Sequence, residues 1–294
     1  MNRPALAALA VLALLIAPGA RADGSGGPVW VLKGSGGGTV YLAGSVHALD
    51  ATRSALPAAF EIAYRDAERL VMEIDFDDLD ETAIAAFMAS HAVFDGEETL
   101  RTVLGPGRFE RLDREARALG LPLDSVATLE PWAVAITLTQ LQLARMGLDP
   151  AKGVEQQFVA RARADAKPIT GLETVEDQLG ALDGLSYADQ ARFLELTIDD
   201  IDRMPAEIER MLAAWQRADL ATLEGMLLDE YERFPALFTP LVDARNRLWL
   251  PQIEALLERS DDTLVIVGAL HLVGRDGLLA MLERAGLKPT PLPP

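Results

Sequence analysis

The sequence contains no cysteine and only three histidines among its 294 residues. Without cysteine the protein forms no disulfide bonds, and it cannot be a lipoprotein of the cysteine-anchored kind. Basic residues are also scarce, with 27 Lys and Arg against 45 Asp and Glu. Because no basic patch stands out to meet a phosphate backbone, the composition argues against nucleic acid as a main partner.

The N-terminus carries an apolar run, residues 5–17, that is too short to span a bilayer comfortably. Arg3 precedes this run, and the small residues Ala20 and Ala22 follow it. A positive start, a short apolar core and small residues before a cleavage point are typical of a secretory signal peptide. We therefore interpret residues 1–22 as a signal peptide and residues 23–294 as a single domain. We expect a secreted or periplasmic protein with no membrane span after cleavage.

Half of the residues are hydrophobic, which provides enough apolar material for a sizeable core. Short apolar runs indicate strands, and the segments between them, above all the middle of the chain, have helical periodicity. This alternation predicts an α/β fold. The predicted strands cover residues 28–33, 39–43, 69–75, 168–173, 263–267 and 288–292.

Two of the three histidines end the same pattern, once near each end of the chain. The first copy is Val40-Tyr41-Leu42-Ala43-Gly44-Ser45-Val46-His47, and the second is Leu264-Val265-Ile266-Val267-Gly268-Ala269-Leu270-His271. In both, an apolar run stops at Gly-x-x-His, so the histidine lies just past a strand, where open α/β sheets place their chemistry. One copy alone is more often a turn than a site. Two copies predict that neighbouring strands bring His47 and His271 together, where a carboxylate would complete a divalent-metal site.

A candidate carboxylate lies on the predicted strand at residues 69–75. Glu73 and Asp75 alternate there with apolar residues and therefore share a face. They are either a surface pair near the end of the strand or part of the histidine site. The third histidine, His91, has no such context, and we interpret it as an ordinary surface or helix-end residue.

These segments, in this order, resemble the TraB/GumN family, which includes the TIKI metalloproteases and is related to ChaN-like and erythromycin-esterase-like proteins. The resemblance runs from about residue 28 to residue 290 and is strongest to the GumN-like bacterial branch. It implies a central mixed β-sheet with flanking helices and a largely helical middle insertion. Besides the two Gly-x-x-His motifs, the matching segments are Val71-Met72-Glu73-Ile74-Asp75, Gly153-Val154-Glu155, Lys167-Pro168, Gly171-Leu172-Glu173-Thr174 and Arg245-Asn246-Arg247-Leu248-Trp249.

In the TIKI branch the two Gly-x-x-His motifs and a glutamate form the metal and catalytic centre of a peptidase. Carried over, this implies that His47, His271 and Glu73 bind a divalent cation such as Mn, Co or Zn. Glu173, Arg245 and Asn246 match further recurring positions and are expected to support the site or face the substrate.

The resemblance therefore favours a metal-dependent hydrolase acting on a peptide or another small polymer. Either Glu73 or Glu173 would be a ligand and the other a general base. Arg245 would either stabilise an oxyanion or form a helix-surface ion pair.

Two alternatives remain open at the level of sequence. One is a non-catalytic periplasmic protein that binds a metal or ligand in the same pocket, and the other is an accessory protein for envelope polysaccharide. The sequence leaves the substrate, the metal and the oligomeric state open.

We predict that signal peptidase cleaves between Ala22 and Asp23, because Ala20 and Ala22 follow the short apolar core. Cleavage removes Arg3 and Arg21, which takes the formal net charge from −18 to −20. Mass spectrometry of the exported protein should find a chain that starts at Asp23. An exported chain with an intact Met1 would rule this out.

Overall fold

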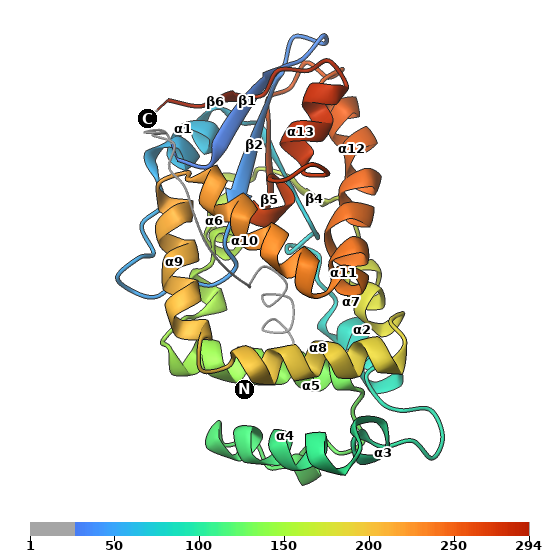
Figure 1. The fold of residues 1–294 in the computed structure, drawn as a ribbon. Helices are drawn as coiled ribbons and strands as arrows, with labels where there is room; N and C mark the ends of the chain where they lie inside the picture. Colours follow the sequence, from blue (N-terminus) through green and yellow to red (C-terminus); the bar gives the residue numbers. More distant parts are fainter. Residues whose placement is uncertain (1–26, 294) are drawn as a thin grey trace. The chain divides into compact units, whose positions relative to one another are not determined.

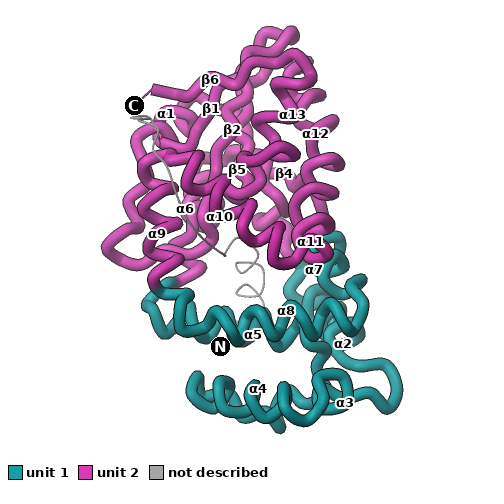
Figure 2. The backbone as a smooth tube through the Cα atoms, viewed as in Figure 1, with its two compact units in different colours: residues 1–12, 80–148, 175–205 teal, residues 13–79, 149–174, 206–294 magenta. Residues whose placement is uncertain are grey.

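The computed structural model describes residues 27–293, so the predicted signal peptide and its cleavage site lie outside the described residues. The described chain forms two compact units (Figure 2). Unit 1 contains residues 80–148 and 175–205, and unit 2 contains residues 27–79, 149–174 and 206–293. That residues 23–294 form a single domain stays a prediction.

Unit 2 is built on a six-stranded mixed sheet with the strand order β4-β3-β5-β2-β1-β6 (Figure 1). The four strands β4, β3, β5 and β2 are parallel to one another, whereas β1 and β6 run antiparallel beyond β2. The sheet confirms the predicted α/β class and the predicted pairing of the two Gly-x-x-His strands. Its strands are β1 (Val29–Lys33), β2 (Thr39–Ser45), β3 (Arg69–Met72), β4 (Ile169–Gly171), β5 (Thr263–Gly268) and β6 (Thr290–Pro291).

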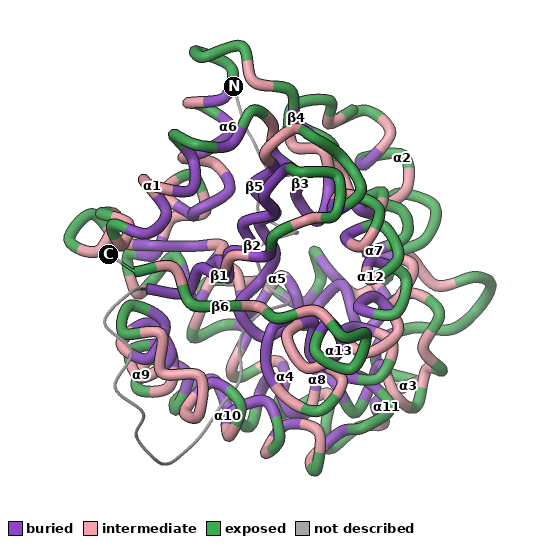
Figure 3. Tube along the Cα trace, turned by 90° about the horizontal axis from the view of Figure 1, so that it is seen from above, coloured by how far each residue is buried: buried purple, intermediate pink, exposed green. Residues whose placement is uncertain are grey.

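Side chains alternate between the two faces of the sheet along each strand. Because β2 and β5 are buried at every position, both faces of the sheet must be covered, and helices cover them. Val265 and Val267 of β5 belong to an apolar cluster with Trp249 of α12 (Arg245–Leu256) and Leu278 of α13 (Leu278–Arg284). On the other face, Tyr41 of β2 donates a hydrogen bond to Asp66, the last residue of α1 (Ala58–Asp66). The central strands β2, β3 and β5 are buried between these layers (Figure 3).

The remaining helices of unit 2 are α6 (Val154–Asp165), α10 (Leu220–Arg233) and α11 (Pro235–Phe238), and α9 (Met204–Gln216) begins at the boundary between the units. The sequence predicts two helices at residues 235–248 and 251–259, and this division is wrong. A π-helical stretch, Thr239–Ala244, joins α11 to α12, and α12 continues through Pro251. Proline removes a single backbone donor, and the burial of Trp249 and Ile253 on either side keeps the helix continuous.

Unit 1 is mainly helical within the described residues, with an isolated β-bridge between Val93 and Leu129, and it accounts for the predicted helical middle of the chain. Its two longest helices, α5 and α8, pack against each other (Figure 1). The sequence does not predict α7, which follows directly after the site residue Glu173. The helices of unit 1 are α2 (Glu81–His91), α3 (Leu100–Leu104), α4 (Pro106–Ala118), α5 (Pro131–Arg145), α7 (Val175–Asp183) and α8 (Tyr187–Asp200).

Gly153, at the start of α6, fixes the loop that carries His47. A Cβ atom at position 153 would lie 2.2 Å from the carbonyl oxygen of His47. The next backbone N–H, that of Val154, donates to the carbonyl oxygen of Val46 over 3.1 Å. The backbone of α6 can therefore lie against this loop only because position 153 has no side chain.

We predict that Gly153→Ala lowers the free energy of unfolding by about 1–3 kcal/mol, the usual result of overpacking, because the new methyl group displaces the His47 loop. Urea denaturation followed by circular dichroism measures the change. Gly180→Ala in α7 is the control, since a Cβ there meets no atom within 4 Å. Equal stabilities of the two variants would contradict this account.

Candidate functional site

The sheet topology brings the predicted site residues to one edge of unit 2. His47 lies two residues beyond the end of β2, Glu73 directly follows β3, and Glu173 lies two residues beyond β4. His271 lies in a single 3₁₀ turn, Ala269–His271, directly after β5. Since these four strands are parallel, their carboxyl ends meet at the same edge of the sheet. The prediction that Glu73 lies on the strand is wrong, because β3 ends at Met72.

Gly268 lies where the two histidines and Glu73 converge. A Cβ atom at this position would be 3.2 Å from Glu73 Oε1, 3.5 Å from His47 Nε2 and 3.6 Å from His271 Cδ2. His47 Nε2 and His271 Cδ2 are therefore at most 7.1 Å apart, because that is the combined length of their distances to this Cβ position. Glycine leaves the space in which these side chains face one another. We call these residues, with Glu155, Glu173, Arg245 and Asn246, the strand-end cluster.

Asn246 fixes the tautomer of His271. The Asn246 amide nitrogen donates to the backbone carbonyls of His271, over 3.1 Å, and Asp276, over 2.9 Å. Its oxygen therefore faces His271 Nδ1, at 2.7 Å, and accepts the proton that Nδ1 carries. The lone pair of His271 lies on Nε2, where Arg245 Nη1 donates over 3.2 Å. Burial, together with the charge of Arg245, lowers the pKa of His271 to about 3, so the ring is neutral.

The environment of His47 raises its pKa, whereas the environment of His271 lowers that of His271. Its Nδ1 lies 2.9 Å from Glu155 Oε1, which also accepts a hydrogen bond from the hydroxyl of Ser45. Burial alone lowers the pKa of His47, but the charge and hydrogen bond of Glu155 outweigh burial and raise the pKa to about 9. His47 is therefore an imidazolium at neutral pH in the metal-free protein, and its Nδ1 donates to Glu155.

Arg245 lies between two carboxylates and is 4% exposed. Its Nη2 is 2.6 Å from Glu73 Oε2 and 2.7 Å from Glu173 Oε1, and its Nε is 3.0 Å from Glu173 Oε1. Its Nη1 donates to the carbonyl oxygen of Leu241 over 3.0 Å as well as to His271. A guanidinium has five N–H groups. These contacts engage all of them.

The two glutamates of the cluster have different acidities. Burial raises the pKa of Glu73, yet Arg245 and the Gly268 N–H, which lies 2.7 Å from Oε1, contribute to lowering it to about 2. Burial raises the pKa of Glu173 above its usual range in spite of Arg245 and of the Trp249 indole, which donates over 3.2 Å. Glu73 is therefore a fixed anion, and Glu173 is the carboxylate that takes up a proton more readily.

Comparison with known proteins identifies the family. The TraB/PrgY/gumN family model matches residues 28–291. The chain belongs to the TraB/PrgY/gumN family. It is 25% identical over 244 residues to the uncharacterized protein YbaP of Escherichia coli (strain K12), a match covering 83% of this chain and 87% of YbaP. It is 22% identical over 272 residues to an uncharacterized protein of Treponema pallidum (strain Nichols), covering 88% of this chain and 80% of that protein. No solved structure matches the chain.

The structure brings all six predicted site residues of this TraB/PrgY/gumN chain into one cluster. Asn246 contacts His271 and backbone carbonyls, so it positions a histidine. The assignment of metal-binding and catalytic roles to these six residues stays a prediction. Sequence reasoning missed the role of Glu155, although Gly153-Val154-Glu155 stood among the matching segments. The glycine immediately before α6 was the available signal, since it marks a close backbone approach.

The donor set of the cluster is the kind that divalent cations use. Each histidine is held at Nδ1 by a partner, which is the usual arrangement for an imidazole that binds a metal through Nε2. His271 Nε2 and Glu73 Oε1 lie 4.0 Å apart. Among residues 27–293, however, no three His, Asp or Glu side chains are arranged to hold a metal as they stand. The residues fit a cation in kind, and a cation bound to His271 Nε2 would have to displace Arg245 from that atom.

We predict that His47 in the metal-free protein titrates with a pKa near 9 and that Glu155→Gln lowers this pKa, since Glu155 is the main cause of its rise. Its folded-state pKa lies above the unfolded value of about 6.5. The stabilisation by Glu155 should therefore be complete below about pH 6.5 and disappear as pH rises through 9.

NMR titration of the histidine side chains measures the pKa, and denaturation of both proteins across this range measures the stability. His91, which is exposed, is the internal reference. A His47 pKa that Glu155→Gln leaves unchanged would refute the assignment.

Proposed function

We propose that this chain is a metal-dependent hydrolase, acting on a peptide or a related small polymer, with the strand-end cluster as its centre. The observation that carries the proposal is the arrangement of the two imidazoles. Each has Nδ1 engaged by a partner, Glu155 or Asn246, and both rings face Glu73 across Gly268. Paired imidazoles with a carboxylate are typical ligands of catalytic Zn, Mn and related cations.

His47, His271 and Glu73 would hold the cation. When bound, a divalent cation in such a site polarises substrate oxygens and lowers the pKa of water toward neutrality. His271 is already the neutral tautomer with its lone pair on Nε2, whereas His47 must lose a proton before Nε2 can act as a ligand. Cation binding should therefore release a proton from His47 below pH 9.

Glu173 is the better candidate for the general base and acid. A proton carrier needs a pKa nearer to the working pH than that of a fixed anion. Burial raises the pKa of Glu173, while the pKa of Glu73 is lowered to about 2. Both carboxylates accept hydrogen bonds from the same Nη2 atom of Arg245, so the two groups lie close together.

Arg245 would connect cation binding to substrate binding. All five of its N–H groups are engaged in the structure, which leaves no donor for a substrate oxygen. The contact with His271 Nε2 is the one that a cation would replace. That replacement frees one Nη1–H, and a free N–H beside the centre can stabilise negative charge developing on a substrate oxygen.

The proposed location is the periplasm or the extracellular space. It rests on the apolar N-terminal run and the small residues before Asp23. Between residues 27 and 293, no helix has both the length and the apolar character needed to cross a bilayer.

The second candidate function is a protein that binds a cation or a small ligand without turning it over. The observation in its favour is the closed ion-pair network, in which Arg245 and Glu73 are each at most 4% exposed. A role as accessory protein for envelope polysaccharide would also need no chemistry at this centre.

The test combines metal binding with peptide cleavage. We expect the wild-type protein to bind Mn, Co or Zn in calorimetry and to cleave members of a peptide mixture analysed by mass spectrometry. His271→Ala should lose both, because it removes a ligand. Glu173→Gln should keep metal binding and lose about a hundredfold or more of the cleavage rate, the scale of losing a general base.

Asp78→Asn is the control, since it removes one exposed carboxylate outside the cluster. Metal binding without any cleavage by the wild-type protein would favour the second candidate. Cleavage that survives in His271→Ala would exclude the proposed centre.

A further inference from the structure

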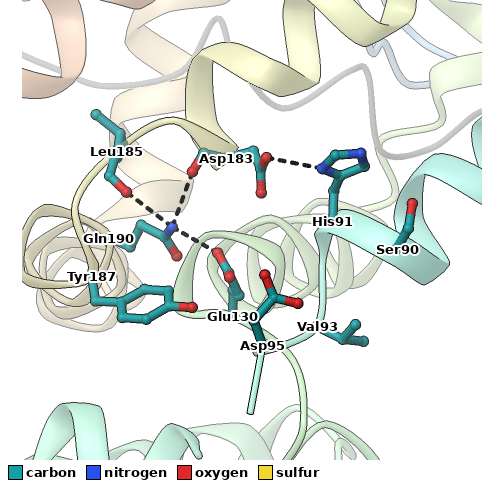
Figure 4. A pocket seen from close by; sticks show the side chains of 9 residues that line it. All are labelled: Ser90, His91, Val93, Asp95, Glu130, Asp183, Leu185, Tyr187 and Gln190. Carbon is teal, nitrogen blue, oxygen red and sulfur yellow. Dashed lines mark hydrogen bonds and ion pairs between the residues drawn. The ribbon is translucent and has the colours of Figure 1, made fainter. Parts of the chain in front are cut away.

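Unit 1 contains a cavity of about 320 Å³ that lies outside the strand-end cluster (Figure 4). Its wall includes the end of α2, the loop after it, the residue before α5, and the α7–α8 connection with the start of α8. The polar residues that matter here are His91, Asp95, Glu130, Asp183, Tyr187 and Gln190. All of them belong to unit 1, so the occupancy of this cavity does not depend on the chemistry proposed for unit 2.

The cavity has an excess of negative charge. Three carboxylates line it, those of Asp95, Glu130 and Asp183, and no Lys or Arg is among its lining residues. His91 is the basic group on the wall, with its Nδ1 3.2 Å from Asp183, and its side chain is 48% exposed. Glu130 is 6% exposed, and burial raises its pKa even though Gln190 and Tyr187 act to lower it. No Lys or Arg among the lining residues balances the buried carboxylate of Glu130, and His91 is paired with Asp183.

Gln190 provides an independent sign that a hydrogen-bond donor binds here. Its side chain is 1% exposed, and its Nε2 donates to Glu130 Oε2 over 2.7 Å, to the Leu185 carbonyl over 3.2 Å and to the Asp183 carbonyl over 3.4 Å. Three acceptors around Nε2 fix the orientation of the amide, because a flipped amide would point its oxygen at all three.

The orientation of the Gln190 carbonyl oxygen is consequently fixed as well. Figure 4 shows it pointing into the cavity, toward Glu130 and Tyr187. It is buried and accepts no hydrogen bond from any of residues 27–293. Buried acceptors without a donor are rare, so this oxygen indicates a donor that the chain itself does not supply.

We propose that this cavity binds a small primary ammonium compound. An ammonium group supplies a positive charge for Glu130 and its neighbouring carboxylates, and its three N–H groups include a donor for Gln190 Oε1. Val93 and the ring of Tyr187 are apolar parts of an otherwise largely polar lining, so the compound would carry only a short alkyl chain. The volume is at the small end of the range for ligand pockets.

The first test is isothermal titration calorimetry of the purified protein with n-butylammonium chloride. Tetramethylammonium, which carries the charge but no N–H group, and n-butanol, which carries the chain but no charge, are the comparison probes. We expect butylammonium to bind and each comparison probe to bind at least about tenfold more weakly, the scale of one hydrogen bond to a charged group. Equal binding of tetramethylammonium would overturn the role of Gln190.

The variant Glu130→Gln should weaken butylammonium binding about tenfold or more, because the side chain keeps its shape and loses its charge. Glu110→Gln removes a similar charge from an exposed position of α4 in the same unit and should leave binding unchanged. Asp95→Asn, at an exposed wall position, serves if Glu130→Gln fails to fold by circular dichroism, and it should also weaken binding.

A further comparison distinguishes two sources of the ammonium group. Tighter binding of 1,5-diaminopentane than of Nα-acetyl-lysine amide would identify a free amine, and the reverse order would identify a lysine side chain. No butylammonium binding, as expected if water alone satisfies Gln190 Oε1, would overturn the proposal. Displacement of butylammonium by Mg²⁺ or Ca²⁺ at equal concentration would overturn it in favour of a metal site.

Discussion

The buried guanidinium of Arg245 holds the strand-end cluster together. It bonds Glu73, Glu173, His271 and the carbonyl oxygen of Leu241, which come from four separate segments of unit 2. Removing one partner of a buried ion pair typically destabilises a protein by about 3–5 kcal/mol, because the remaining charge is left uncompensated. Arg245 begins α12 directly after the π-helical stretch Thr239–Ala244. π-Helical turns are frequent at functional sites, and this one places the arginine over the ends of the parallel strands.

The two Gly-x-x-His motifs are alike in sequence and unlike in chemistry. Both histidines follow paired parallel strands in register, with Ser45 opposite Gly268. Glu155 makes His47 a cation, whereas Asn246 and Arg245 keep His271 neutral with its lone pair on Nε2. The partner of the second ring nitrogen thus decides what each imidazole can do. In the proposed metal centre, His271 would be ready to act as a ligand, whereas His47 would first have to lose a proton.

The sequence predicted the elements that depend on local pattern. The α/β class, the helical middle and the pairing of the two histidine strands all follow from apolar runs and the repeated motif. The errors concern features set by distant contacts. β3 ends before Glu73 because that carboxylate turns to Gly268 and Arg245, and Glu155 meets Ser45 across 110 residues of chain. The cavity around Gln190 left no local signal, since polar residues on amphipathic helices are ordinarily solvated.

The proposed function requires a change in the Arg245 network. As it stands, the guanidinium donates all of its N–H groups to protein acceptors. Its contacts with Glu73 and Glu173 are charge-assisted, while its contact with His271 is to a neutral nitrogen 3.2 Å away. Hydrogen bonds between charged groups are roughly twice as strong as neutral ones. The link to His271 is therefore the weakest of the contacts that Arg245 makes with side chains. Its loss would expose Nε2 of His271. Under the proposed function, a cation that competes for this nitrogen would break that link while Arg245 stays bound to both carboxylates, and His47 would also have to lose its proton.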